Sequence, residues 1–180
     1  MESRVQATAL PVTKQDLVSI YEQYSPGLYR YAYRLLGDRD QAEEAVSETF
    51  SRFLQAIQNG GGPNANIQAY LYRVTHNYVT DLYRRRPSEP ISLEAEQYAD
   101  EHSNPVHLAT KAFEQERVRK ALLLLAPDQR RVLMLRVLED WSHEDVAIAL
   151  GKTVEATRAL QYRALGSLRR LLLENEEDPQ

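Results

Sequence analysis

Two segments of the chain carry side chains that could bind nucleic acid. The segment with the more specific pattern runs from Ser142 to Leu165. Ser142 can cap a short helix that ends at Gly151, and Thr153 can cap a second helix directly after it. This spacing predicts a helix-turn-helix, in which the start of the second helix enters the major groove of DNA. Arginines there can reach phosphates or guanine edges. The DNA-facing side is expected to carry Glu155, Arg158, Ala159, Tyr162 and Arg163.

The opposite faces of the same two helices have apolar residues at helical spacing, so they are expected to pack inward. The inward set is Val146, Ala147, Leu150, Thr157, Leu160, Ala164 and Leu168. A plainer alternative is a pair of ordinary antiparallel helices with solvated arginines. Arg130, Arg131 and Arg136 on the preceding helix could add phosphate contacts or could form a solvated face.

The second segment, 69–86, interleaves tyrosines with an amide and a basic end. Rings among cations suit single-stranded nucleic acid, because splayed bases stack on the rings while arginines follow the backbone. An inward stripe is expected at Leu71, Val74, Tyr78 and Leu82. The candidates for the outer face are Tyr72, Arg73, His76, Asn77, Thr80, Tyr83 and Arg84. The alternative is that the tyrosines are partly buried core residues.

The distribution of charge matters more than its sum. The net charge is −4, but acidic residues are concentrated in 87–105, which has no Lys or Arg, and in the tail after Leu173. Elsewhere basic residues predominate, which favours separate electropositive surfaces. The chain has no cysteine, so disulfides and thiolate chemistry are excluded.

Enzymatic and metal chemistry have little support in the sequence. The four histidines, His76, His102, His107 and His143, lack the spacing of a metal site, and Gly60–Gly62 is not followed by the Lys-Ser or Lys-Thr of a phosphate-binding loop. We therefore expect a protein that is not an enzyme and needs no cofactor. With no secretory signal and no bilayer-length apolar run, a cytoplasmic protein without membrane insertion is expected.

The pattern predicts an all-α chain made of two small helical domains. Thr13 and Pro26 are each expected to open a helix, Gly37 to end the second, and Asp38 or Asp40 to begin a third. The expected divisions are a flexible N-terminus 1–12, a first domain 13–86, an extended acidic linker 87–105, a second domain 106–173 with helices at 106–126, 127–138, 142–150 and 153–173, and an acidic tail 174–180.

The order of these pieces resembles the extracytoplasmic-function (ECF) group of the primary sigma family, the specificity subunits of bacterial RNA polymerase. Residues 28–57 resemble the start of sigma region 2, and residues 69–86 resemble its melting and recognition helix. Residues 121–172 resemble region 4. The resemblance implies a region 2 helical bundle and a region 4 helix-turn-helix that direct core polymerase to promoters.

The resemblance also implies roles for individual residues. Contacts with the −35 element are expected at Thr153, Glu155, Arg158, Tyr162 and Arg163, with Arg130 and Arg131. Contacts with the −10 element are expected at Asn64, Asn66, Tyr72, Arg73, Asn77, Asp81, Arg84 and Arg85, where loop 59–66 would accept a flipped base. Many family members carry a basic residue where Leu160 stands and Ser or Thr where Ala159 stands, so the promoter sequence stays open.

The implied partners are core RNA polymerase, promoter DNA in duplex and single-stranded form, and an anti-sigma factor. Polymerase would be held at the clamp helices of its largest subunit and at its flap. The clamp-binding residues are expected to be Asp40, Glu43, Glu44, Glu48 and Phe50. The main rival is a conventional helix-turn-helix regulator that binds duplex operators as a dimer, but it leaves the aromatic basic helix and the acidic linker unexplained.

Overall fold

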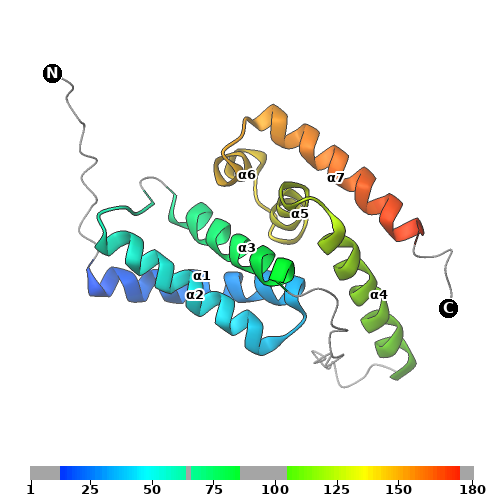
Figure 1. Ribbon diagram of the computed structural model, residues 1–180, viewed down its shortest axis with the longest axis horizontal. Coiled ribbons are helices and arrows are strands. Elements are labelled where there is room, and N and C mark those ends of the chain that lie inside the picture. The colour runs from blue at the N-terminus through cyan, green and yellow to red at the C-terminus, as the bar shows by residue number, and fades with distance from the viewer. Residues whose placement is uncertain (1–12, 64–65, 86–104, 175–180) are drawn as a thin grey trace.

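The computed structural model describes residues 13–63, 66–85 and 105–174, the side chains of 105–109 excepted, and all the regular structure in these ranges is helical. The first module contains α1 (Lys14–Leu36), α2 (Arg39–Gln58) and α3 (Ile67–Arg85). The second contains α4 (Pro105–Leu124), α5 (Pro127–Leu133), a π-helical turn η1 (Met134–Leu138), α6 (His143–Leu150) and α7 (Val154–Glu174). Figure 1 shows α3 between the α1–α2 pair and α5–α6. The all-α prediction is confirmed.

Local capping chemistry fixes most of the helix ends as predicted. The Thr13 hydroxyl accepts from the Asp16 amide while the Asp16 carboxylate accepts from the Thr13 amide, which makes a reciprocal capping box. Asp38 caps α2, and Ser142 caps α6 through the Asp145 amide. Gly37 ends α1 in the left-handed region at φ 67°, where a residue with a Cβ is strained.

One predicted boundary is wrong, because α1 runs continuously through Pro26. Proline removes the backbone bond to the carbonyl four residues earlier, which belongs to Glu22. Both Pro26 and Glu22 are exposed, so this carbonyl lies on the solvent side of the helix. The helix therefore continues, and it is held by the burial of Leu28, Tyr31, Ala32 and Leu35 rather than by propensity.

The first module is a three-helix bundle around large apolar side chains. Tyr31, Leu35 and Leu71 are fully buried, and Phe53 of α2 is 1% exposed and lies 5.9 Å from the Tyr70 ring. Two buried threonines, Thr49 and Thr75, meet at 2.8 Å between α2 and α3. Each hydroxyl also lies within hydrogen-bond distance of the backbone carbonyl four residues earlier in its own helix, so both buried hydroxyl protons have an acceptor.

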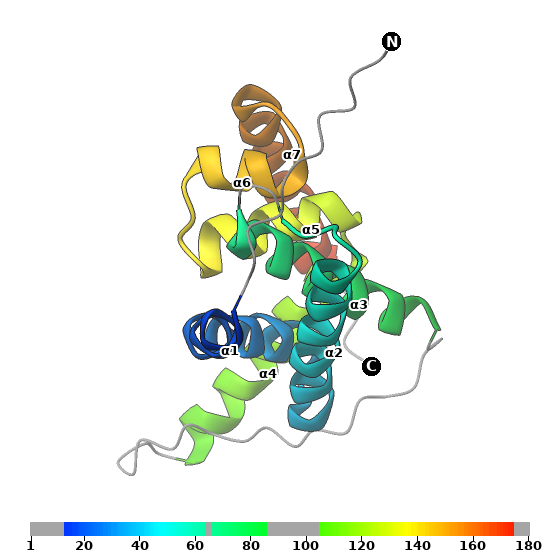
Figure 2. The same cartoon turned by 90° about the vertical axis from the view of Figure 1, so that its left-hand side faces the viewer.

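Helix α3 is buried on two sides. Leu71, Thr75 and Val79 pack in the first module, whereas Tyr72 (5% exposed) and His76 (0%) lie on the side that the second module covers. Figure 2 shows α3 in this intermediate position from a second direction. The expectation that Tyr72 and His76 face outward is therefore wrong, because a second packing surface covers them.

The neutral form of His76 is favoured by its surroundings. Burial lowers its pKa well below the ordinary value of 6.5, and the charges of Arg131 and Arg130 lower it further. The ring is held by Tyr31, whose hydroxyl oxygen lies 2.6 Å from Nδ1. A proton on His76 would thus add a buried positive charge beside two arginines.

We predict that Phe53→Ala lowers the free energy of unfolding by about 3–5 kcal/mol, because the truncation leaves a cavity in the bundle. Leu54→Ala is the matched control on the same helix, since Leu54 is 38% exposed. It should cost less than about 1 kcal/mol. Urea unfolding of both variants tests the prediction, and equal losses would contradict this assignment of the core.

A second prediction concerns pH. The pKa of His76 is lowered in the folded chain, so below its ordinary value of 6.5 the unfolded chain binds the proton and the folded chain does not. Stability should be fully present above that value and fall as pH falls, at first by roughly 1 kcal/mol per unit. Urea midpoints at pH 7.5, 6.5 and 5.5 measure the slope. His76→Gln should flatten it, and parallel slopes in the two proteins would refute the role of His76.

Candidate nucleic-acid interface

The second module contains the predicted helix-turn-helix. Gly151 has φ 63° and ends α6, and the Lys152 amide bonds the Ala147 carbonyl at 2.9 Å across the turn. Thr153 then caps α7, because its hydroxyl accepts from the Ala156 amide at 3.1 Å. The predicted inward set is confirmed, with most members buried and Leu150 and Leu168 half-buried.

The outward side of α7 brings the predicted −35 residues together. Tyr162 is 82% exposed, and Glu155, Arg158, Ala159 and Arg163 are exposed with it. Leu160 is 9% exposed and packs inward, so the cationic side chains of this surface are Arg158 and Arg163. Together with the positive end of the helix dipole, these arginines suit an anionic backbone or a guanine edge. We call residues 153, 155, 158, 162 and 163 the α7 face.

The arginines of α5 do not extend this face. Arg130 is 4% exposed and points into the contact between the modules, beside Tyr31 and Tyr83. Arg131 is half-buried, and its guanidinium donates to the Asn77 amide oxygen of α3 at 2.8 Å. The prediction that these two arginines supplement the −35 contacts is therefore not met by their positions in this structure. Each is turned toward the first module instead.

The predicted −10 residues on α3 fall into an exposed group and a buried one. Its exposed members, Arg73, Asn77, Arg84 and Arg85, lie along one polar side, and Asp81 pairs with Arg84 at 3.6 Å. The Arg73 guanidinium stacks over the Tyr70 ring at 5.6 Å, an arrangement that also suits a stacked base. Tyr72 is buried and is not available on this side.

The loop before α3 is only partly described. Asn66 acts as the cap of α3, because its side-chain oxygen accepts from the Ala69 amide at 2.8 Å. Asn64 lies outside the described residues, so its expected base contact stays a prediction.

Most of the predicted clamp-binding residues lie on the surface of α2, but not all of them. Asp40, Glu43 and Glu44 are exposed, and Glu48 pairs with Arg52 at 2.7 Å. Phe50 is 9% exposed, so its predicted direct contact with polymerase is not supported by its position. Its ring packs 4.8 Å from the Tyr21 ring, whose residue is 50% exposed.

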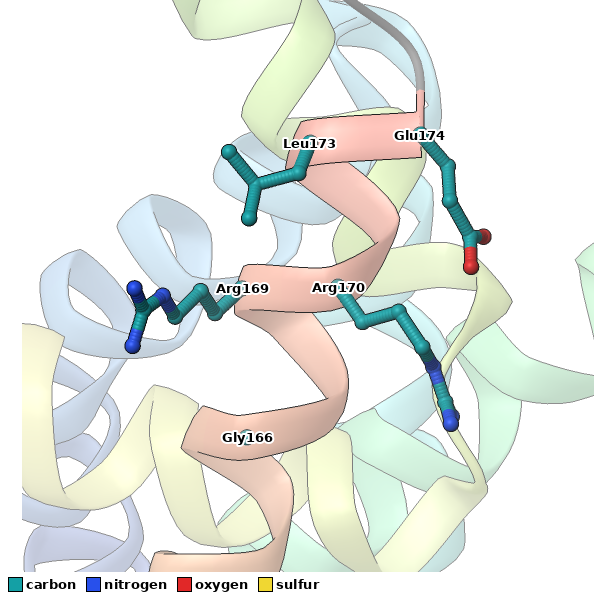
Figure 3. A pocket seen from close by; sticks show the side chains of 5 residues that line it. All are labelled: Gly166, Arg169, Arg170, Leu173 and Glu174. Carbon is teal, nitrogen blue, oxygen red and sulfur yellow. The ribbon is translucent and has the colours of Figure 1, made fainter.

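Two of the hollows on the described part of the chain are shallow and polar at their edges. One, of about 280 Å³, lies on α7 beyond the helix-turn-helix, lined by Gly166, Arg169, Arg170, Leu173 and Glu174, and Figure 3 shows both arginines extending away from the helix. The other, of about 320 Å³, lies where α1 and α3 meet Glu139 and Trp141.

Neither a metal-binding cluster nor a membrane-spanning helix is found within the described ranges. No group of three or more His, Asp or Glu side chains there is placed to bind a metal ion. No helix there combines the length and apolar character that a bilayer crossing requires.

Comparison with known proteins matches both modules to one family. Residues 20–88 match Sigma-70 region 2, and residues 115–168 match Sigma-70 region 4. Among solved structures, the fold is similar to the sigma factor RpoE in complex with the anti-sigma factor NepR from Bartonella quintana (TM-score 0.61, 23% identity, 88% of this chain and 97% of that one). It is also similar to CnrH in complex with the cytosolic domain of CnrY (TM-score 0.64, 22% identity, 93% and 92%).

Three curated relatives are more similar in sequence than these solved structures. The ECF RNA polymerase sigma factor BldN of Streptomyces coelicolor is 33% identical over 158 residues, which is 85% of this chain and 59% of BldN. A second relative, SigE of Mycolicibacterium smegmatis, is likewise covered over only 62% of its length. The ECF RNA polymerase sigma factor EcfG of Rhodopseudomonas palustris is 32% identical over 147 residues, 82% of this chain and 80% of EcfG. The chain, with both sigma regions in order, therefore belongs to the ECF RNA polymerase sigma factors.

Proposed function

We propose that this chain binds core RNA polymerase and directs it to promoters, in the cytoplasm where transcription occurs, without covalent chemistry of its own. The observation that carries the proposal is the exposed α7 face, which follows a correctly capped turn in the module that matches region 4. Family membership supplies the polymerase as the partner. No cofactor is needed, because trapping an unpaired base shifts the duplex equilibrium by binding alone.

The α7 face suits the upstream duplex. Arg158 and Arg163 can each pair with a guanine edge or a phosphate, and Glu155 can accept from a cytosine amino group. Tyr162 offers an apolar ring edge as well as a hydroxyl. Through these contacts the second module would bind the −35 element.

The exposed side of α3 suits the downstream strand. Asn77 can form a bidentate pair with adenine, while Arg73, Arg84 and Arg85 follow the phosphates of a strand whose bases have unstacked. Loop 59–66 would receive the flipped base. The first module thus holds the −10 element open.

The acidic residues of α2 suit a basic protein surface on the polymerase clamp, and the second module would contact the flap. The solved relatives RpoE and CnrH are each recorded in a complex, the first of them with an anti-sigma factor. We propose a similar inhibitory partner for this chain.

Transcription initiated in vitro with core polymerase tests the proposal. Arg158→Ala and Arg163→Ala should each reduce promoter use by roughly 5–100-fold, because each removes a contact worth about 1–3 kcal/mol. Arg170→Ala is the control, since Arg170 is exposed on the same helix but outside the α7 face. If both face variants initiate as the control does, α7 is not the reader of the upstream element.

Binding to core polymerase is a separate expectation. Charge reversal by Glu43→Lys with Glu44→Lys should weaken association by about tenfold at low salt, and the difference should shrink as salt rises. Glu22→Lys, an exposed reversal on α1, is the control. Fluorescence titration of labelled chain with core polymerase measures all three affinities. Equal affinities would place the polymerase contact elsewhere.

A further inference from the structure

The hollow of about 320 Å³ lies where three segments of the chain meet. Its walls come from α1, from α3 and from the segment that follows the π-helical turn. A volume of this size is at the lower end of the range for small-molecule sites, which occur preferentially between modules. We call it the junction hollow, and its lining includes Gln23, Arg30, Gln68, Tyr72, Glu139 and Trp141.

Helices α1 and α3 run in the same direction beside the junction hollow, in a fixed register. Gly27 lies next to Tyr72, because a Cβ at Gly27 would stand 2.6 Å from the Tyr72 hydroxyl. One turn later in both helices, the Tyr31 hydroxyl lies 2.6 Å from Nδ1 of His76. Residues at equal steps from the contact of Gly27 with Tyr72 therefore lie at the same level of the two helices.

One end of the junction hollow is rich in amides. One turn before Gly27 and Tyr72, α1 carries Gln23 and α3 carries Gln68, so their two amides lie at one level. Each amide offers two donor hydrogens and an acceptor oxygen. The half-buried Tyr24 adds a ring beside them. This amide end suits a flat group with hydrogen-bonding edges, such as a nucleobase.

The other end of the junction hollow carries charge. The Glu139 side chain is 7% exposed, and its carboxylate accepts from Arg34 at 2.8 Å and from the Tyr72 hydroxyl at 3.1 Å. Arg34 therefore offsets the charge of Glu139. Arg30 is exposed and forms no ion pair with another described residue. Its positive charge remains uncompensated within the described part of the chain, so this end suits an anion.

Aromatic side chains form the wall between the two ends. Trp141 is 7% exposed, and its ring lies 4.9 Å from the Tyr72 ring. Burial raises the pKa of Tyr72, and the charge of Glu139 raises it further, so the phenol keeps its proton and donates to Glu139. This wall is held by contacts within the chain, so a ligand would not have to order it on binding.

We propose that the junction hollow binds a free mononucleotide, with the base at the amide end and the phosphate at Arg30. A guanidinium suits a phosphate group because two of its N–H groups can bond two oxygens at once. Gln23 lies about two turns before Arg30, roughly 10 Å along the helix axis, which is a span that a nucleotide can bridge. The site goes beyond the proposed function, since Gln23, Arg30 and Gln68 belong to neither proposed DNA surface.

Trp141 makes the site directly measurable, because it is the single tryptophan of the chain. The full chain, without polymerase, is titrated with the 5′-monophosphates of adenosine, guanosine, cytidine and uridine. At least one should change the Trp141 fluorescence saturably, with a Kd of roughly 10 µM to 1 mM. The matching nucleoside and inorganic phosphate should each bind at least about tenfold more weakly, because each occupies only one end.

Two variants assign the ends. Arg30→Gln should weaken binding of the preferred nucleotide by roughly 10–100-fold and leave binding of its nucleoside unchanged. Gln68→Leu should weaken the nucleotide and the nucleoside by a similar factor. Arg52→Gln removes an exposed cation from α2 instead and should bind as the unaltered chain does. Circular dichroism verifies that all three variants are folded, as the exposed or half-buried positions lead us to expect.

Several results would overturn the proposal. They are a Trp141 signal that no monophosphate changes saturably, an Arg30→Gln variant that binds as tightly as Arg52→Gln, and inorganic phosphate that binds as tightly as the nucleotides. A short single-stranded oligonucleotide should bind no more tightly than the monophosphate, because the hollow has room for one nucleotide. Much tighter binding of the oligonucleotide would assign these residues to a strand and would also overturn it. Promoter recognition is measured separately, so neither result decides the other.

Discussion

Burial of α3 on two sides is the constraint from which the positions of the proposed DNA contacts follow. Leu71, Thr75 and Val79 are buried and hold α3 in its own bundle. The polar residues of the helix can therefore lie only on the part of its circumference that faces away from this bundle. The second module covers part of this outward side, where Tyr72 and His76 are buried. What is left is a narrow polar side with Asn77 and the terminal arginines, and this side forms the proposed single-strand reader.

Local chemistry made much of this structure predictable. The caps at Thr13 and Ser142 and the left-handed glycines 37 and 151 mark helix ends because the signal and its effect lie within one turn. The α7 face was predictable for a related reason, since one helix carries both its inward and outward residues. Pro26 misled the prediction because tertiary packing outweighed the lost backbone bond.

Long-range pairing was not predictable in the same way. Glu139 and Arg34 are 105 residues apart, and neither belongs to a pattern that singles it out. Tyr72 and Arg130 were assigned to DNA on the basis of residue type, but each is covered by the other module. The amphipathic period of α3 indicates one buried face of this helix. Its second buried face is explained only by the second module, which is distant in the sequence.

The two proposed DNA surfaces therefore differ in availability, and the difference is physical. The α7 face depends only on contacts within the second module, so packing against the first module leaves it exposed. The α3 side is partly covered by a contact that encloses Arg130, whose Nε and Nη1 atoms have no hydrogen-bond partner among the described residues. The proposed duplex reader is therefore exposed in this structure, while part of the proposed single-strand reader is covered.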